Sequence, residues 1–177
     1  GKADLAGYVL SGCPGAPDED RSEMADALQA AADTGLADEP LDILGPFNDA
    51  FEPARTPYDW LSRDPDEVDR YIADPLCGDD HPLTHGYVAD IFRLGNDALS
   101  EDGVARTPTD LPVLLLTGEM DPVSAMGAQV RDLESLMREA GLVVTAHYYP
   151  DARHEVLNET NRDDVHADVI RWLGTVT

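Results

Sequence analysis

Residues 112–118 read PVLLLTG, a nearly continuous apolar run that ends in glycine. Two further segments share this pattern, LAGYVLSG at 5–12 and LVVTAHYY at 142–149. Short uninterrupted apolar runs bounded by glycine are typical of parallel strands that are covered on both faces. Helical patterns separate the three runs. The order predicts an α/β fold, with a parallel sheet and right-handed crossovers.

The helical patterns lie in two kinds of region. Ser22 is expected to cap a helix that stops before Gly35, and Ser124 to cap another through about residue 140. Asn161 is expected to cap the last helix. Between them, residues 40–109 are rich in proline, glycine and aromatic residues and show only short helical patterns. This stretch is interpreted as a helical insertion.

The predicted domain organisation follows from these patterns. Residues 1–13 begin an α/β core, residues 14–109 form a helical cap or lid, and residues 110–177 complete the core. A doubly covered parallel sheet normally has more than three strands. The chain is therefore expected to be the second part of a larger domain. A strand at residues 5–12 without its neighbour would leave an apolar edge, which favours self-association or complementation by the missing half.

The charge of the chain excludes some partners. The 177 residues include 36 acidic and 12 basic side chains, a formal net charge of -24. Such a surface repels nucleic-acid phosphates and anionic membranes, and it is typical of halophilic proteins. No apolar run approaches the ~18 residues of a membrane helix, so stable insertion is not expected. Two cysteines make no disulfide framework, and a cytoplasmic location is expected.

Two chemically informative loops follow predicted strands. Asp121 comes just after the 112–118 run, and His154 comes after the 142–149 run. Open parallel sheets place their sites at the carboxyl ends of strands, and neighbouring strands lie about 4.8 Å apart. An aspartate bonded to one imidazole nitrogen leaves the other nitrogen as a base, which is two thirds of a nucleophile–His–acid triad. Without a histidine partner, Asp121 would be interpreted as an ordinary acidic residue that stabilises a helix N-terminus.

Three longer motifs carry a resemblance to a known family. LLLTGEMDPVS at 114–124 and YYPDARHEVLNE at 148–159 resemble the C-terminal half of α/β-hydrolases of the lysophospholipase and monoacylglycerol-lipase type, often described as serine aminopeptidase-like. TPYDWLSRDPDEVDRYIADPLCG at 56–78 resembles the cap of that group, and LAGYVLSG resembles the strand after its nucleophile helix.

The resemblance implies a partial α/β-hydrolase fold with a helical cap over an acyl pocket. It implies that Asp121 is the triad acid and His154 the general base, and that the substrate is a small lipophilic ester or acylglycerol. It also implies no metal and no cofactor. The aromatic residues expected to line the pocket, which would otherwise form the small core of the cap, are Phe47, Phe51, Trp60 and Tyr71.

The nucleophile of the family is missing from the sequence. The G-x-S-x-G elbow is absent, as is an HG-type oxyanion segment, and both are expected upstream of Leu5. Ser11 and Cys13 end the first strand but lack the flanking glycines, and Pro14 has no N–H for an oxyanion. Neither residue is favoured as the nucleophile. This chain alone is expected to be inactive.

Other titratable residues invite weaker interpretations. Asp79, Asp80, His81 and His85 have a spacing that a metal site could use, but Pro82 and the loop context favour a solvated cap loop. His147 in a strand and His166 on the last helix are interpreted as structural or surface residues. Glu119 and Glu155 flank the Asp121 and His154 loops and are interpreted as surface charge, although they could influence His154. Cys77 is interpreted as a packing residue.

The sequence thus favours the C-terminal part of a serine hydrolase that cleaves carboxylic esters. The resemblance implies lysophospholipids or monoacylglycerol-like lipids as substrates; the aromatic cap agrees with a lipid, and the acidic surface favours a neutral ester over an anionic one. A non-catalytic or degenerate hydrolase-fold module stays open as the alternative, since the elbow is absent. A serine aminopeptidase is a third interpretation.

Overall fold

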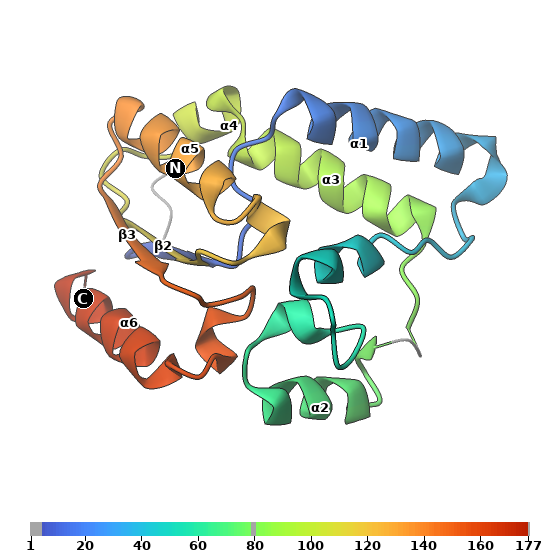
Figure 1. Ribbon diagram of the computed structural model, residues 1–177. Helices are drawn as coiled ribbons and strands as arrows, with labels where there is room; N and C mark the ends of the chain where they lie inside the picture. Colours follow the sequence, from blue (N-terminus) through green and yellow to red (C-terminus); the bar gives the residue numbers. More distant parts are fainter. Residues whose placement is uncertain (1–4, 79–80, 177) are drawn as a thin grey trace.

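The computed structural model describes residues 5–78 and 81–176 (Figure 1). Its centre is a parallel three-stranded sheet in the order β1-β2-β3. The strands are β1 (Tyr8–Ser11), β2 (Val113–Gly118) and β3 (Val144–Tyr149). The predicted α/β class and its parallel sheet are confirmed. Each strand is one to four residues shorter than its apolar run.

Helices joined by loops and turns make up the rest of the described chain. Among residues 5–78 and 81–176, no helix combines the length and the apolar character needed to cross a membrane. The α-helices are α1 (Glu19–Ala31), α2 (Pro65–Ala73), α3 (His85–Leu99), α4 (Glu101–Ala105), α5 (Ala128–Glu139) and α6 (Arg162–Val176). The π-helix η1 (Ala32–Leu36) extends α1, and the short 3₁₀ helices are η2 (Gly45–Phe51), η3 (Asp59–Leu61), η5 (Pro122–Ser124) and η6 (Val156–Asn158).

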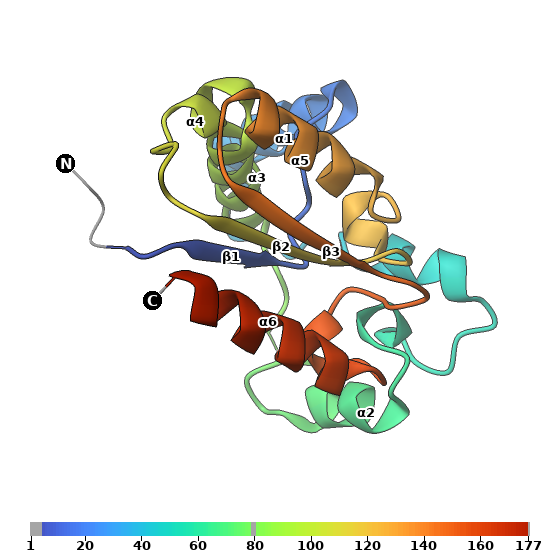
Figure 2. The same cartoon turned by 90° about the vertical axis from the view of Figure 1, so that its left-hand side faces the viewer.

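The central strand is covered on both faces. Figure 2 shows α5 on one side of the sheet and α6 on the other. Val113 and Leu115 pack with residues of α5, whereas Leu114 and Leu116 pack with Val165 and Trp172 of α6. Side chains of a strand point alternately to opposite faces, so a strand that is buried on both must be apolar throughout. This explains the uninterrupted run that β2 contributes.

The segment between β1 and β2 forms two helical parts. In the first, α1 and α3 lie side by side, and Leu28 packs against Val88 and Ala89 (Figure 1). The second, which we call the cap segment, comprises residues 44–73 with η2, η3 and α2. Its small core is built from Tyr58, Trp60, Leu61 and Val68, with Leu44, Phe47, Phe51, Tyr71 and Val123 packed around it.

The first helix begins earlier than the sequence predicted. Asp18, not Ser22, is its N-cap, and the Asp18 carboxylate accepts a hydrogen bond from the Arg21 amide at 2.8 Å. The Ser22 hydroxyl instead donates to the Asp18 carbonyl. An acidic first turn, with Glu19 and Asp20, favours the earlier start because carboxylates interact well with a helix N-terminus.

The predicted helix at Ser124 is also wrong in its first turn. Residues 122–124 form η5, and α5 starts only at Ala128 after a turn in which Ala125, Met126 and Gly127 have positive φ. Met126 lies in this turn and is 38% exposed. The turn forms because the Asp121 carbonyl accepts the Met126 amide at 2.8 Å. The chain therefore wraps around Asp121 before α5 begins.

The end of β2 lies against the loop that follows β3. A Cβ atom added to Gly118 would stand 2.1 Å from the Ala152 carbonyl oxygen and 2.2 Å from that of Arg153. Both atoms belong to the backbone, so neither can move aside without displacing the loop. Glycine at this position lets the ends of the two strands approach each other.

We predict that Gly118→Ala lowers the free energy of unfolding by about 2–3 kcal/mol, because overpacking against backbone cannot relax locally. Urea denaturation measures the change. Gly174→Ala in α6 is the matched control, since its added methyl group meets nothing within 4 Å. Alanine suits a helix better than glycine, so the control should gain up to about 1 kcal/mol. Equal stability of Gly118→Ala and the wild type would contradict the predicted close approach.

Candidate active site

Asp121 lies in the turn that follows β2, and its side chain is fully buried. Its carboxylate accepts the Val123 amide at 3.0 Å, which caps η5. Its backbone carbonyl accepts the Met126 amide. The turn therefore holds the carboxylate away from water. A buried carboxylate is costly unless charged or hydrogen-bonded groups compensate it, so Asp121 needs a further partner.

His154 is that partner. Its Nδ1 lies 3.1 Å from Oδ1 and 3.2 Å from Oδ2 of Asp121. The geometry assigns the Nδ1 proton to this bond, because a carboxylate only accepts hydrogen bonds. Nε2 is then the nitrogen left to take a proton. The Asp121 side chain is 0% exposed and that of His154 is 23% exposed, so the acid is buried and the base is reachable.

Two neighbouring segments position the imidazole. A Cβ atom on Gly12, which follows β1, would lie 2.9 Å from the His154 carbonyl oxygen and 3.1 Å from Cε1. On the other side, the rings of Trp60 and His154 have centroids 5.1 Å apart. The histidine is therefore held between the end of the sheet and the cap segment.

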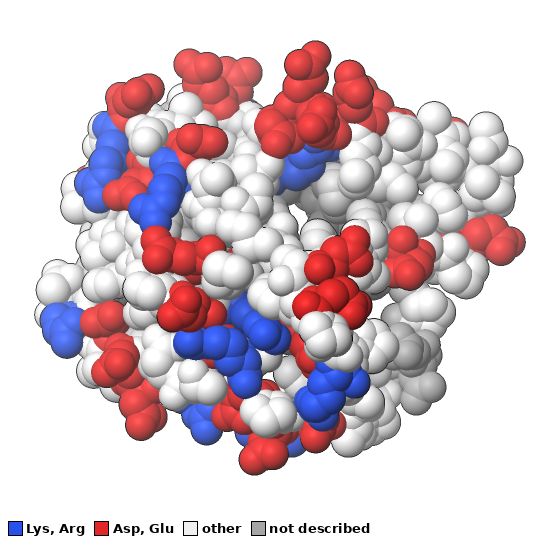
Figure 3. Space-filling view, in the orientation of Figure 1, with Lys and Arg blue, Asp and Glu red and all other residues white. Residues whose placement is uncertain are grey.

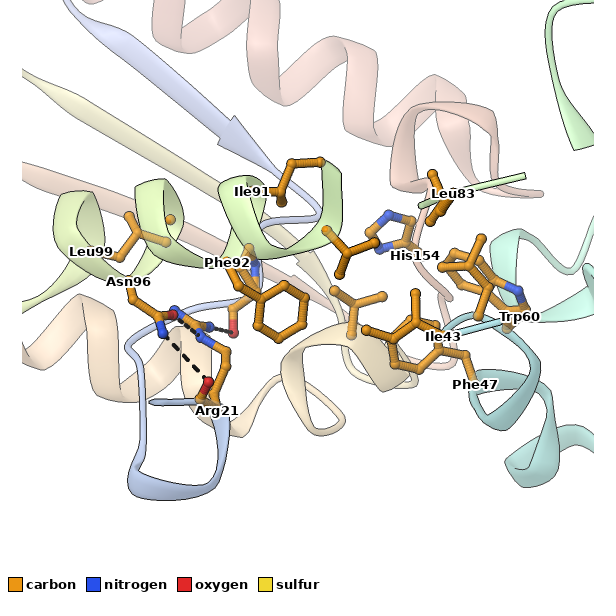
Figure 4. Close-up of a pocket in the computed structure, with 15 residues that line it drawn as sticks. Arg21, Ile43, Phe47, Trp60, Leu83, Ile91, Phe92, Asn96, Leu99 and His154 are labelled. Carbon is orange, nitrogen blue, oxygen red and sulfur yellow. Dashed lines mark hydrogen bonds between the residues drawn. The ribbon is translucent and has the colours of Figure 1, made fainter. Parts of the chain in front are cut away.

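His154 lies on the wall of an apolar cavity of about 390 Å³ (Figure 4). The cap segment, α3 and η5 contribute most of the wall. The lining residues are Pro14, Arg21, Ile43, Leu44, Phe47, Trp60, Leu83, Val88, Ile91, Phe92, Gly95, Asn96, Leu99, Val123 and His154. A concave, mostly apolar site with a few polar groups is the usual form of a small-molecule pocket.

The four aromatic residues predicted for the pocket separate into two pairs. Phe47 and Trp60 line the cavity, and their ring centroids are 5.2 Å apart. Phe51 and Tyr71 are not among its described lining residues. Phe51 lies under the Arg153 guanidinium at 4.1 Å, and Tyr71 packs on Tyr58 in the core of the cap. The structure therefore brings Phe47 and Trp60 to this cavity, whereas Phe51 and Tyr71 make their described contacts within the cap segment and with Arg153.

The end of the cavity opposite His154 is polar. Arg21 Nε donates to Asn96 Oδ1 at 2.7 Å, and Nη1 donates to the carbonyls of Pro14 and Gly15 (Figure 4). Burial lowers the pKa of Arg21, and nearby Asp18 opposes that shift. Asp and Glu are absent from the described lining residues, so the cavity presents no carboxylate to a ligand.

The residues considered as substitute nucleophiles differ in burial. Ser11 is the last residue of β1 and is exposed. Cys13 follows it, and burial raises the pKa of its thiol, with the charge of Asp121 adding to the shift. A raised pKa reduces the thiolate fraction, and the thiolate is the nucleophilic form of cysteine.

The residues considered for a metal site are engaged elsewhere or lie outside the description. Nε2 of His81 is 2.7 Å from the Pro75 carbonyl, and Nδ1 of His85 is 3.0 Å from that of Glu39. Asp79 and Asp80 lie outside the described residues. Within the described parts of the chain, no group of three or more His, Cys, Asp or Glu could hold a metal ion.

The other polar residues noted in the sequence have structural contacts. His147 Nδ1 is 3.4 Å from Asp168 Oδ2, and His166 Nε2 is 3.1 Å from the Leu157 carbonyl. Cys77 lies after α2 and is partly buried. Glu119 forms an ion pair with Arg131, and the Glu155 carboxylate accepts a hydrogen bond from Asn158 Nδ2 at 2.7 Å. Acidic side chains cover much of the face in Figure 3, with arginines among them.

The parallel sheet, with the acid and histidine loops at its carboxyl edge, matches part of the α/β-hydrolase fold. The sequence profile of the serine aminopeptidase family S33 matches residues 2–161. The chain belongs to this family.

Solved structures agree on the fold. The chain is similar to a thermostable carboxyl esterase from Bacillus coagulans, with 24% identity and a TM-score of 0.86 over 98% of this chain and 58% of that one. It is also similar to the Paleococcus ferrophilus monoacylglycerol lipase, with 21% identity and a TM-score of 0.64 over 98% of this chain and 60% of that one. A third similar structure is the Saccharomyces cerevisiae monoglyceride lipase, with 17% identity and a TM-score of 0.65 over 98% of this chain and 54% of that one. The chain spans about three fifths of the length of these relatives.

Sequence reasoning missed most of the cavity wall. Ile43, Leu83 and Phe92 come from segments that are separate in sequence and meet only through the packing of α1, α3 and the cap segment. One signal was available in the sequence: Val88, Ile91, Phe92 and Leu99 recur at helical spacing, and all four line the cavity, with Ile91 48% exposed.

We predict that Ile91→Asp weakens binding of methyl decanoate, a neutral lipophilic probe, at least about tenfold. The added carboxylate would have to lose water when an apolar chain fills the cavity, and tenfold corresponds to only about 1.4 kcal/mol. Titration calorimetry on the 177-residue chain measures the dissociation constant. Ile170→Asp, at a 69% exposed position of α6, is the matched control and should bind as the wild type does. Equal binding by all three proteins would show that the probe sits elsewhere.

Proposed function

We propose that this chain supplies the acid, the base and the cap of a serine hydrolase that cleaves lipophilic carboxylic esters. One observation carries the proposal: the buried Asp121 holds the Nδ1 side of His154 at 3.1 Å, and that imidazole lies on the wall of an apolar cavity. This arrangement supports nucleophilic catalysis, because it fixes a tautomer and gives the base access to a bound molecule.

The proposed chemistry has two halves. In the first, Nε2 of His154 takes the proton of a serine hydroxyl while the serine Oγ bonds to the ester carbonyl carbon. The imidazolium then gives this proton to the departing alkoxide as the C–O bond breaks, which leaves an acyl-enzyme. In the second half, Nε2 takes a proton from water as the water oxygen bonds to the acyl carbon, and the imidazolium gives that proton to the serine Oγ as its bond to the acyl carbon breaks, which releases the carboxylic acid and restores the serine. Asp121 stays ionised and stabilises each imidazolium.

The serine of this mechanism is proposed to come from a segment outside these 177 residues. The sequence has no G-x-S-x-G elbow, and the chain spans 58% of the Bacillus coagulans esterase that it resembles. We propose that the active unit is a longer protein, that the present chain is inactive alone, and that a segment carrying the elbow can complement it. A non-catalytic module is the outcome if no such segment restores activity.

The cavity supports a neutral, lipophilic substrate. Its wall is built from aliphatic and aromatic side chains, and the protein carries a formal charge of -24. An apolar acyl chain gains free energy there in proportion to the area removed from water, about 25 cal/mol per Å². Monoacylglycerol-like esters fit this description; lysophospholipid-like esters share the apolar acyl chain but carry a charged phosphate, which makes them the less favoured class. The names of two structural relatives, both monoacylglycerol or monoglyceride lipases, agree with the first class.

A serine aminopeptidase is the second candidate, and the description of the family favours it. An aminopeptidase must recognise the α-ammonium group of its substrate, which calls for a carboxylate near the reacting bond. The described lining residues include none. The cavity therefore supports ester hydrolysis better than removal of N-terminal residues.

In the active protein that carries this chain, we predict that His154→Ala lowers kcat for p-nitrophenyl octanoate at least about 1,000-fold. Loss of the imidazole removes both the base and the acid of the mechanism. Initial rates at saturating substrate give kcat. His166→Ala is the matched control, because His166 is an exposed histidine of α6, and its kcat should stay within about twofold. Full activity of His154→Ala would reject the assignment of the base.

We further predict that kcat/KM for p-nitrophenyl octanoate exceeds that for leucine p-nitroanilide at least about 100-fold. The octanoyl chain can occupy the apolar cavity, whereas the ammonium group of leucine finds no carboxylate in its described wall. Release of the coloured leaving groups reports both reactions. A preference for the anilide would instead support the aminopeptidase.

A further inference from the structure

The loop that carries His154 is hydrogen-bonded to the cap segment along a seam. We use "seam" for the contact between residues 59–64 of the cap segment and residues 153–162. The His154 amide donates to the Trp60 carbonyl at 3.4 Å, and the Glu155 amide donates to the Leu61 carbonyl at 2.8 Å. The Ser62 hydroxyl donates to the Asn158 carbonyl at 2.9 Å. The backbone of His154 and of the residue that follows it is thus bonded to the cap segment.

Arg153 adds a side-chain connection to the same seam. Its Nη1 donates to the carbonyls of Asp59 and Ser62, the latter at 3.3 Å. The guanidinium lies 4.1 Å above the centre of the Phe51 ring. Burial lowers the pKa of Arg153, while Asp59 and Glu159 act in the opposite direction. The residue immediately before His154 is therefore anchored inside the cap.

Glu159 joins the two sides of the seam from a fully buried position. Its side chain is 0% exposed. Oε1 accepts the Arg153 amide at 2.8 Å and the Arg63 amide at 3.0 Å. Oε2 accepts Arg63 Nε at 2.9 Å and the Thr160 amide at 2.9 Å. A single carboxylate thus bonds the backbone next to His154 and the backbone of the cap segment.

The protonation of Glu159 agrees with this role. Burial alone would raise the pKa of the carboxyl, but the hydrogen bonds from Arg153, Thr160 and Arg63 outweigh it, and the pKa lies below its ordinary value. The ionised form is therefore the one that the fold stabilises. Ionised Glu159 therefore stabilises the folded protein fully above the pKa of an unfolded glutamate, about 4.3. This stabilisation is lost as the pH falls through the lower pKa that Glu159 has in the folded protein.

We propose that Glu159 is a positioning residue, which sets the place of His154 by fixing its loop against the cap segment. The inference rests on the proposed function, because it concerns the same base. Trp60 belongs to the cap side of the seam, lines the cavity and contacts the imidazole. A shift of the cap therefore moves the wall of the cavity and the base together. Displacements of about 1 Å at a catalytic group can cost 100-fold in rate.

The experiment follows the Nδ1 proton of His154 in the ¹⁵N-labelled 177-residue chain. Long-range ¹H–¹⁵N spectra report the tautomer, and saturation transfer reports the exchange of this proton with water. Glu159→Gln places an amide NH₂ against N–H donors, so at least one pair of bonds is lost while the shape is kept. We expect exchange at least about tenfold faster than in the wild type, with both tautomers populated.

Glu134→Gln is the matched control for lost stability. Glu134 is a partly buried carboxylate that accepts Arg138 Nε at 2.9 Å and the Tyr148 hydroxyl at 2.7 Å, and so joins α5 to β3 away from the seam. This variant should be destabilised as well, yet keep the wild-type exchange at His154. The same effect in both variants would reduce Glu159 to a general stabilising role and overturn the proposal.

Two further variants complete the test. If Glu159→Gln does not fold, Arg63→Met removes two donors from the cap side of the seam, Nε to Glu159 and Nη2 to Asn161, and it should speed the exchange at least about threefold. Wild-type exchange in every seam variant that folds overturns the proposal.

Asp121→Asn separates the two hypotheses. If it leaves the His154 tautomer unchanged, the acid–base pair and the proposed function fail; if it alters the tautomer while Glu159→Gln does not, only the role of Glu159 fails.

Discussion

The hydrogen bond between the buried Asp121 carboxylate and His154 is the interaction on which the rest of the arrangement depends. A carboxylate with no exposed surface is tolerated only where partners compensate its lost hydration. The Val123 amide supplies one partner and the imidazole the other. The turn after β2, with three successive residues at positive φ, wraps around Asp121 and holds its carboxylate next to His154.

The parallel sheet brings the acid and the base together from distant parts of the sequence. The carboxyl ends of β2 and β3 are neighbours, with Gly118 paired to Tyr149 at the last position of the register. Gly118 and Gly12 have no side chains, and the loop of His154 packs directly on both. The cap segment closes the other side through Trp60 and the seam. The base therefore belongs structurally to both the sheet and the cap.

Much of this could be predicted from the sequence, because some features depend on local patterns. Apolar runs in the sequence predict the three strands, and Asp121 and His154 follow two of these runs. The helix starts at Ser22 and Ser124 were mispredicted, because Asp18 competes with the first and the turn around Asp121 displaces the second. The cavity wall and the Glu159 contacts join residues far apart in sequence, which no local pattern encodes.

The central claim is that Asp121 and His154 serve a serine nucleophile. Its most direct test is a crystal structure of the active protein that carries this chain after reaction with a dodecyl fluorophosphonate. The account predicts phosphonate on a single serine, whose Oγ lies about 3 Å from Nε2 of His154, with the alkyl chain in the cavity lined by Phe47 and Phe92. A protein that hydrolyses esters but is labelled on a residue out of reach of His154 would contradict it.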